Sequence, residues 1–294
     1  MGFILSEHIY GGAGVHVSHL VSALLSESEA RIKKIDVHCF DGARSGSDSR
    51  NPVHGYQLEE RFDLLNPAIA SLLIDSEMLP NLKGVDLVHS HTWYANFAGD
   101  LAKRTFSIPH VITAHSLEPR RPWKAEQLGS GYAISSWIES TSYRTADAII
   151  AVSDGMRDDV LDCYPFLHPE QVKTIRNGID TESFSPTLSR DFLDRNSISG
   201  PFAVFVGRIT RQKGLAHLLR AWRSVDPALG LVIAAGNPDE KQIGVEVSEL
   251  IKSLQAERRN VWWFDEMLPH RDLVELLSAA EIFICPSRYE PLGI

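Results

Sequence analysis

The chain has 294 residues, and at about 150 residues per domain this length predicts two domains. Hydrophobic residues make up 44% and charged residues 23%, as in a globular protein with a full core, and 20 glycines with 15 prolines exclude collagen-like and low-complexity chains. The net charge of −9 argues against DNA, RNA or an anionic membrane surface as the main partner, but leaves room for a local basic pocket.

The three cysteines, Cys39, Cys163 and Cys285, lie far apart and show neither zinc-site spacing nor a disulfide framework. Cys39 and Cys285 stand inside apolar runs, which predicts small buried core residues. No apolar run approaches the roughly 18–20 residues of a membrane span, and the N-terminus shows no signal-peptide pattern. We therefore expect a cytoplasmic protein in a reducing compartment.

Short apolar runs alternate with helical patterns through the first part of the chain. This β-α-β-α order predicts a mainly parallel sheet with helices on both faces. The expected strands are residues 3–5, 35–40, 86–89, 110–113, 148–152 and 172–175, and the expected helices include 67–76, 93–103, 129–145 and 154–163.

A polar break at residues 185–200 precedes a second β-α series. Residues 1–186 are assigned to an N-terminal Rossmann-like domain, 187–200 to a linker and 201–294 to a C-terminal domain, with the two doubly wound α/β domains facing a cleft. Since the sequence stops shortly after the last strand, we expect the second domain to be incomplete. Its expected strands are 202–206, 229–234, 261–264 and 282–285, and its expected helices are 216–224, 245–257 and 272–280.

A glycine cluster follows the first expected strand and opens a helix. Gly11, Gly12 and Gly14 let the backbone approach a ligand, and a helix N-terminus attracts phosphate groups; a tight turn without a ligand is the equally open alternative. A dinucleotide site is disfavoured, because Val17 occupies the third glycine position of that fingerprint and Asp36 opens the second strand instead of closing it.

Three histidines, His89, His91 and His115, stand at the ends of two expected strands. They could bind zinc, but we expect at most one of His89 and His91 to face any given site, so core histidines are favoured and no metal is predicted. His115 is the better active-site candidate, since a polar loop follows it. It could donate a hydrogen bond to a sugar hydroxyl or to developing negative charge.

Cations gather on the glycine-bounded loop of residues 207–214 in the second domain. Arg208 offers a bidentate fork and Lys213 a compact charge, and together they suit the two phosphates of a diphosphate. The alternative, a solvated loop with ordinary surface charges, is less favoured. Glu290 follows the last expected strand, where a carboxylate could hold sugar hydroxyls or stabilise positive charge on a sugar ring. The alternative for Glu290 is a surface turn.

Taken together, these stretches resemble the retaining glycosyltransferases of family 4, which have the GT-B fold. Within that family the chain is similar to the short-form glycogen synthases of actinobacterial type, a group that includes maltose-1-phosphate synthases. The resemblance runs through almost the whole chain in order. Its matching stretches are YGGAGVHV (10–17), DLVHSHTWYAN (86–96), HVITAHSLEPRRPWKAEQLGSGY (110–132), SSWIE (135–139), RNGIDTE (176–182), FVGRITRQKG (205–214) and CPSRYEPLGI (285–294).

The resemblance implies roles for individual residues. It places Gly11 and Gly12 beside the donor phosphates and sugar, and His115 at the transferring sugar. Arg208 and Lys213 are then the residues that hold the diphosphate and stabilise it as the leaving group. Glu290 matches the first glutamate of a Glu-seven-residues-Glu motif near the donor sugar, whose second glutamate would lie beyond the end of this sequence.

The chain departs from common bacterial glycogen and starch synthases at two positions. Ile9 stands where those enzymes carry lysine, and Thr92 stands where they carry aspartate. Both departures weaken the simple assignment of the chain as an enzyme that transfers glucose from ADP-glucose to glycogen. They fit the subgroup whose members lengthen α-glucan and also convert glucose 1-phosphate to maltose 1-phosphate.

We therefore expect a retaining glucosyltransferase of α-glucan biosynthesis that needs neither a cofactor nor a metal. Its donor is ADP-glucose by preference or UDP-glucose, and its acceptor is an α-1,4-glucan or glucose 1-phosphate. A phosphate oxygen of the leaving group is the base that the resemblance implies. The alternatives are a GT-B-like sugar-nucleotide epimerase or hydrolase, and an inactive fragment with residual nucleotide binding.

Overall fold

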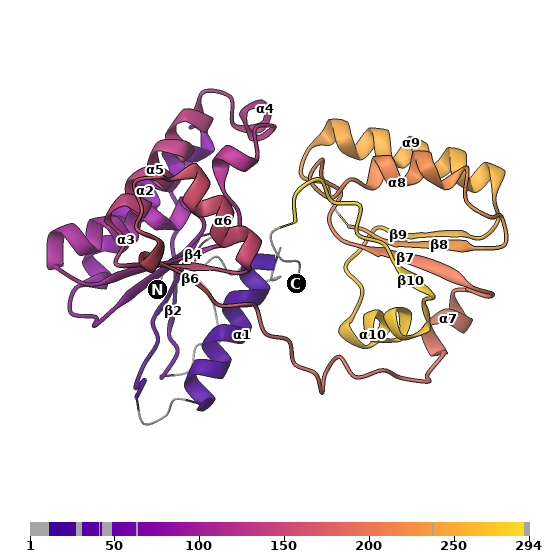
Figure 1. Cartoon of the computed structure of the whole chain (residues 1–294), viewed down its shortest axis with the longest axis horizontal. Coiled ribbons are helices and arrows are strands. Elements are labelled where there is room, and N and C mark those ends of the chain that lie inside the picture. The colour runs from indigo at the N-terminus through magenta and orange to yellow at the C-terminus, as the bar shows by residue number, and fades with distance from the viewer. Residues whose placement is uncertain are drawn as a thin grey trace. The chain divides into compact units, whose positions relative to one another are not determined.

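The computed structural model describes residues 12–27, 31–40, 42, 49–62, 64–236 and 238–290. The chain divides between Asn177 and Gly178 into two compact units (Figure 1). The expected first strand, residues 3–5, and Gly11 lie outside the described residues. Within the part of the chain that is described, no helix is both long and apolar enough to cross a membrane.

The first unit is built on a four-stranded parallel sheet in the order β3-β4-β5-β6. A separate parallel pair, β1 with β2, packs against α1, while α2, α3 and α5 pack together beside the main sheet (Figure 1). The strands are β1 (Val37–Cys39), β2 (Val53–Gly55), β3 (Val88–His91), β4 (His110–Ala114), β5 (Ala148–Ala151) and β6 (Val172–Thr174). The α-helices are α1 (Gly12–Glu27), α2 (Pro67–Met78), α3 (Trp93–Phe106), α4 (Lys124–Leu128), α5 (Gly131–Thr145) and α6 (Asp154–Cys163).

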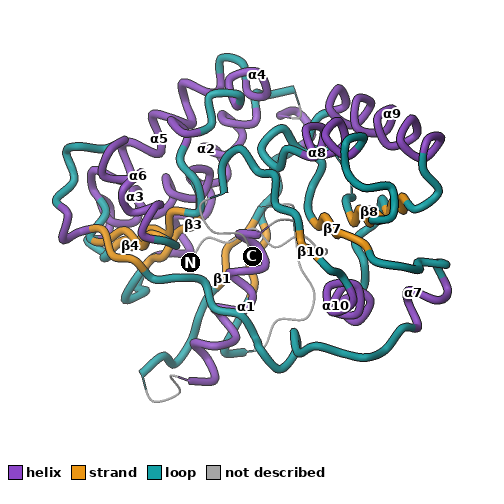
Figure 2. Tube along the Cα trace, turned by 45° about the vertical axis from the view of Figure 1, so that its right-hand side comes forward, coloured by secondary structure: helices purple, strands orange, loops and turns teal. Residues whose placement is uncertain are grey.

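The second unit has a four-stranded parallel sheet in the order β10-β7-β8-β9. Figure 2 labels β10, β7 and β8 of this sheet. Helices α8 and α9 cover one face, and α7 and α10 cover the other (Figure 1). The strands are β7 (Phe202–Val206), β8 (Gly230–Ala234), β9 (Val261–Phe264) and β10 (Ile282–Phe283), and the helices are α7 (Asp191–Arg195), α8 (Leu215–Trp222), α9 (Lys241–Glu257) and α10 (His270–Ala279).

Simple patterns explain why these segments form these elements. Parallel strands covered on both faces are near-continuous apolar runs, and β8, with the sequence GLVIA, is buried at every residue. Leu215, Leu218, Leu219 and Trp222 recur at helical spacing, so α8 packs one apolar stripe on the sheet. Helix α2 begins where the Asn66 side chain accepts a hydrogen bond from the Ala68 N–H at 3.0 Å, directly beside a proline at the first helical position.

The segment expected to be a linker, residues 187–200, carries helix α7 and packs on the second unit. Phe192 and Leu193 are buried in that unit's core. Their backbone N–H groups donate to Glu275 Oε1 at 2.6 and 3.1 Å, so a buried carboxylate stabilises the start of this short helix. The polar composition of the segment does not predict this packing, because it depends on two adjacent apolar residues and on a glutamate far away in the sequence.

The expectation that Cys285 is buried is wrong, whereas Cys39 is buried. Cys285 follows β10, which lies at the edge of its sheet in the described structure. Ile282 and Phe283 on that strand are 51% and 54% exposed. An apolar run at a sheet edge therefore leaves its side chains half in solvent.

Helix α2 carries an ionisable group into the interior of the first unit. This group is Asp75, which is fully buried. Burial raises the pKa of Asp75 well above its usual 3.8. The folded protein therefore keeps this carboxyl protonated at pH values where the unfolded chain ionises it.

We expect Asp75→Asn to stabilise the protein near neutral pH, because the wild-type carboxyl must take up a proton on folding there and the amide does not. The folded pKa is the higher one, so the wild-type stability is complete below about pH 3.8 and falls as the pH rises towards the folded pKa. Urea unfolding of both proteins from pH 4 to 8 measures the difference. Glu77→Gln, an exposed position on the same helix, is the control and should change little. If the free energy of unfolding varied with pH in the same way for wild type and Asp75→Asn, Asp75 would not be the group that takes up the proton on folding.

Candidate functional site

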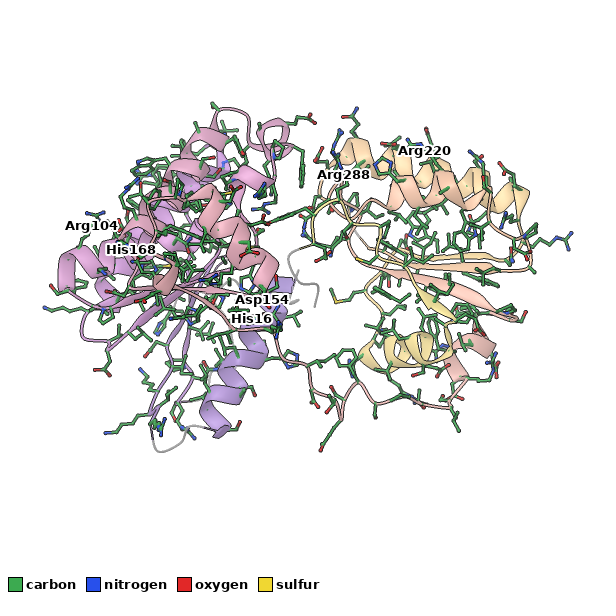
Figure 3. The ribbon with its side chains drawn as sticks, in the orientation of Figure 1. His16, Arg104, Asp154, His168, Arg220 and Arg288 are labelled. Atoms are coloured by element: carbon green, nitrogen blue, oxygen red, sulfur yellow. The ribbon has the colours of Figure 1, made fainter. Side chains whose placement is uncertain are left out.

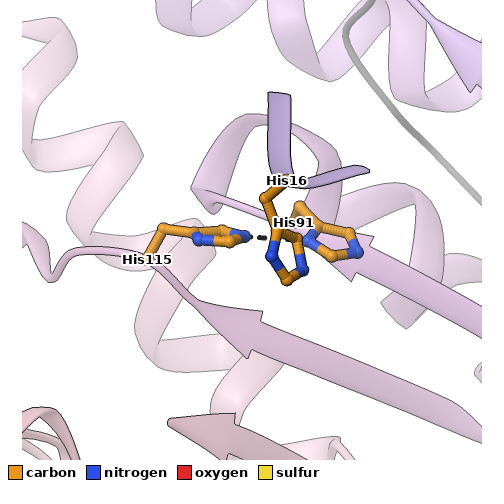
Figure 4. Close-up of side chains that lie close together, drawn as sticks. All are labelled: His16, His91 and His115. Carbon is orange, nitrogen blue, oxygen red and sulfur yellow. Dashed lines mark hydrogen bonds between the residues drawn. The ribbon is translucent and has the colours of Figure 1, made fainter. Parts of the chain in front are cut away.

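Three histidine side chains meet in the first unit (Figure 4). His91 ends β3, His115 directly follows β4, and His16 comes from α1. His91 Nδ1 and His115 Nε2 lie 2.9 Å apart and share a hydrogen bond. The ring of His16 stands edge-on to that of His115, with the centroids 4.8 Å apart. Two neighbouring parallel strands and one helix therefore bring the three rings to one point.

The expectation that at most one of His89 and His91 faces a given site is wrong. Side chains alternate along a strand, so residues two positions apart point to the same face. The rings of His89 and His91 are accordingly only 4.4 Å apart between centroids. His89 Nε2 lies 2.7 Å from Thr113 Oγ1, so His89 supports the cluster from within the sheet.

Burial keeps this cluster uncharged. Removal from water lowers the pKa of His115 to about 3, with a further contribution from His16 and His89. The pKa of His91 is lowered well below its usual value for the same reason, and burial also lowers the pKa of His16. These imidazoles are neutral at physiological pH, so each offers one N–H donor and one acceptor nitrogen.

The loop that follows His115 is tied to helix α5 by two buried carboxyl groups. The Glu118 backbone N–H donates to Glu139 Oε1 at 2.9 Å, and the Tyr164 hydroxyl donates to the same oxygen. Glu118 itself accepts from Ser135 Oγ at 2.7 Å and from Arg121 at 2.5 Å. Because His115 lies three residues before Glu118, this network fixes where the histidine stands.

The second unit gathers opposite charges after β7 and β10. Lys213 Nζ lies 2.6 Å from Glu290 Oε2, and Ser287 Oγ donates to the same oxygen at 2.9 Å. Arg208 pairs with Asp239 at 2.9 Å. The structure therefore brings Lys213 and Glu290 together, while Asp239, a carboxylate not predicted from the sequence, holds the Arg208 guanidinium.

Gly214 explains how the two loops come so close. Its φ is +68°, and a Cβ at this position would lie 2.2 Å from the carbonyl oxygen of Pro286. Nearby, the Arg288 backbone N–H donates to the Gln212 carbonyl at 2.8 Å, on the segment where Figure 3 labels Arg288. Only glycine fits here, and its absent side chain lets the segment that carries Glu290 lie against the cation loop.

Residues near the three histidines include some that were predicted from the sequence and some that were not. Gly12 is the first residue of α1, while Gly11 is outside the described part of the chain. Thr92, next to His91, has a φ of +66°, which is an outlier for a β-branched residue and places backbone strain beside the histidines. His16 was not predicted from the sequence, although it stands two residues after Gly14 on the helix that opens at the glycine cluster, a position that could have indicated it.

Comparison with known proteins places these features in a family. A family model described as Glycosyltransferase Family 4 matches residues 10–183, and one described as Glycosyl transferases group 1 matches residues 194–294. The chain is 48% identical to the alpha-maltose-1-phosphate synthase of Mycolicibacterium smegmatis, covering 97% of this chain and 72% of that protein. It is 27% identical to the glycogen synthase of Mycobacterium tuberculosis, covering 97% and 71%.

The fold is shared with a solved plant enzyme. The catalytic domain of starch synthase IV from Arabidopsis thaliana, bound to ADP and acarbose, superposes with a TM-score of 0.70 at 16% identity, covering 100% of this chain and 78% of that one. At such low identity the likeness shows a common fold.

We expect Gly214→Ala to destabilise the protein by at least ~2 kcal/mol, because the new Cβ combines a left-handed backbone with a clash against the Pro286 backbone. Gly200→Ala is the matched control. Gly200 also has a positive φ, +76°, but a Cβ there meets nothing within 4 Å, so that variant should lose only about 1 kcal/mol. Chemical denaturation measures the free energy of unfolding of both variants. Equal decreases would contradict the prediction, because they would show that the Pro286 backbone moves away from the new Cβ without loss of stability.

We expect Glu139→Gln to fold and to be at least as stable as wild type at pH 7, whereas Glu139→Ala should lose ~2 kcal/mol or more by leaving the Tyr164 hydroxyl and the Glu118 N–H unpaired. Burial raises the pKa of Glu139 to about 8, so the glutamine mimics the protonated acid.

The pH dependence of stability distinguishes the protonated from the ionised form of Glu139. Since the folded pKa exceeds the usual 4.5, wild-type stability from this group is complete below pH 4.5 and is lost as the pH rises through about 8. Glu139→Gln should lack that decline, and Glu170→Gln, at an exposed position, should keep it. A decline that persists in Glu139→Gln would assign it to another group.

Proposed function

We propose, given that this chain belongs to glycosyltransferase family 4, that it transfers glucose with retention from a nucleotide diphosphate sugar to glucose 1-phosphate or an α-1,4-glucan. The chain is a glycosyltransferase with parallel α/β units of the GT-B family. The observation that carries the choice of acceptor is the 48% identity to a maltose-1-phosphate synthase against 27% to a glycogen synthase. Glucose 1-phosphate is therefore the preferred acceptor. ADP-glucose is the preferred donor, on the resemblance to bacterial glycogen synthases, with UDP-glucose as the alternative.

The cation loop suits the leaving group. Lys213 and Arg208 are paired with Glu290 and Asp239. A diphosphate would compete with these carboxylates for the two cations, which would then neutralise the negative charge that grows as the glycosidic bond breaks. Glu290, released from Lys213, would be free to accept hydrogen bonds from donor sugar hydroxyls.

His115 suits a different task because it is neutral. A neutral imidazole can donate one hydrogen bond to a hydroxyl of the transferring glucose without adding a charge of its own. In the proposed reaction the acceptor hydroxyl attacks the anomeric carbon from the face that the diphosphate leaves. Its proton passes to a phosphate oxygen of the leaving group, so the nucleotide diphosphate and the lengthened sugar are the only products.

We also propose that the protein works in the cytoplasm, without nucleic acid or a membrane as a partner. All three cysteines are free, which fits a reducing compartment. The net charge of −9 disfavours anionic polymers and surfaces.

The deciding experiment crosses two donors with two acceptors. Release of nucleotide diphosphate is measured with ADP-glucose and UDP-glucose, each with glucose 1-phosphate, with glycogen and without an acceptor. We expect ADP-glucose with glucose 1-phosphate to be fastest and to yield maltose 1-phosphate. Equal release without an acceptor would indicate a hydrolase, and conversion of the donor sugar alone would indicate an epimerase; either result contradicts the proposal.

We expect the double variant Arg208→Ala, Lys213→Ala to lose transfer by a factor of roughly 10²–10⁴, since each charge-assisted bond to the diphosphate contributes about 1.5–3 kcal/mol. Arg220→Ala is the control: it breaks an ion pair with Glu246 on the exposed side of α8, where Figure 3 labels Arg220, and should leave activity intact. Circular dichroism checks that both variants fold. Retained transfer in the double variant would remove the cation loop from the reaction.

His115→Ala tests the sugar side of the proposal. If His115 contacts the transferring glucose, the variant should lower kcat much more than it lowers affinity for the nucleotide diphosphate, because the two groups are bound by different residues. Turnover and calorimetric nucleotide binding are measured on the same preparation. A lower melting temperature with normal turnover would instead identify a core histidine.

A further inference from the structure

We propose that His16, His91 and His115 bind one divalent ion of the zinc, copper or nickel class, and that this ion blocks the enzyme. One ring nitrogen from each of the three residues can be chosen so that all three lie within 4.8 Å of one another. Figure 4 shows the three rings converging from α1, β3 and the end of β4. The proposed reaction uses no metal, so the ion would be an inhibitor and not a cofactor.

The distances suit tetrahedral coordination. Zinc binds imidazole nitrogen at about 2.0–2.1 Å, which separates two ligand nitrogens by about 3.3 Å. His91 Nδ1 and His115 Nε2, at 2.9 Å, need only a small separation to admit an ion. His16 must approach further, but it is only half-buried on its helix, so its side chain has room to turn. Three protein ligands leave the fourth position for water.

The ligands are chemically ready. A metal binds an imidazole through an unprotonated ring nitrogen, and every neutral imidazole has one. The hydrogen that His91 and His115 now share would move to the other ring nitrogen of the residue that donates it, so no proton is released to solvent. A site of imidazole nitrogens alone selects zinc, copper or nickel over magnesium and calcium, which prefer oxygen ligands.

The inhibition follows from what the ion occupies. A metal on His115 Nε2 would tie this ring to His16 and His91, so that it could no longer move to donate a hydrogen bond to the transferring sugar. The cation loop of residues 207–214 is not a ligand, so nucleotide binding should persist while turnover falls. This inhibitory consequence rests on the proposed function, whereas binding of the ion does not.

The experiment titrates wild type, His16→Ala and His19→Ala with Zn²⁺ by calorimetry and with Co²⁺ by absorption. His19 is the matched control, a histidine on the exposed side of the same helix, three residues further on. We expect one ion per wild-type chain with a tetrahedral cobalt spectrum, and Mg²⁺ should not compete. His16→Ala should bind at least about tenfold more weakly, since even an outer-shell partner contributes about 10–100-fold. His19→Ala should match wild type.

Several results would overturn the proposal. They are no binding to wild type, equal binding by a folded His16→Ala, or a cobalt spectrum with thiolate charge transfer, which would place the ion at a cysteine. None of these results would alter the transfer assay, so the proposed function would stand. Zinc binding at the cluster without loss of turnover would overturn the inhibition and count against the role of His115 at the sugar.

Discussion

Parallel strand pairing is the constraint on which the rest of this structure depends. Every pair in both four-stranded sheets is parallel, so the carboxyl ends of neighbouring strands lie on one edge of each sheet. His91 and His115 meet because β3 and β4 end side by side. Lys213 and Glu290 meet because the segments after β7 and β10 leave the same edge. Residues far apart in the sequence become neighbours without a long loop to carry them.

The two clusters differ in electrostatics as their proposed tasks require. In the first unit burial keeps the histidines neutral, so they can bond sugar hydroxyls without attracting the diphosphate. In the second unit Lys213 and Arg208 remain partly exposed and paired with carboxylates, so they can exchange one anionic partner for another. Buried neutral polar groups suit recognition of a neutral sugar, and accessible charges suit a leaving group that gains charge.

Local patterns made much of the fold predictable, and they supplied the candidate site residues. The apolar runs of β7 and β8 identified strands, and the residue types at strand ends singled out His115, Lys213 and Glu290. What local patterns could not supply was long-range contact. The Glu118–Glu139–Tyr164 network joins residues 21 and 25 positions apart, and Glu275 reaches back 83 positions to Phe192. The error at His89 and His91 has another origin, since strand periodicity alone would have put both on one face.

Retention at the anomeric carbon is the central claim of the proposed chemistry, and proton NMR of the running reaction tests it most directly. With a nucleotide diphosphate glucose donor and glucose 1-phosphate, the account predicts a new α-anomeric signal that grows in step with the release of nucleotide diphosphate. A new β-anomeric signal would contradict attack from the face that the leaving group vacates. So would loss of the donor signal that gives only free glucose.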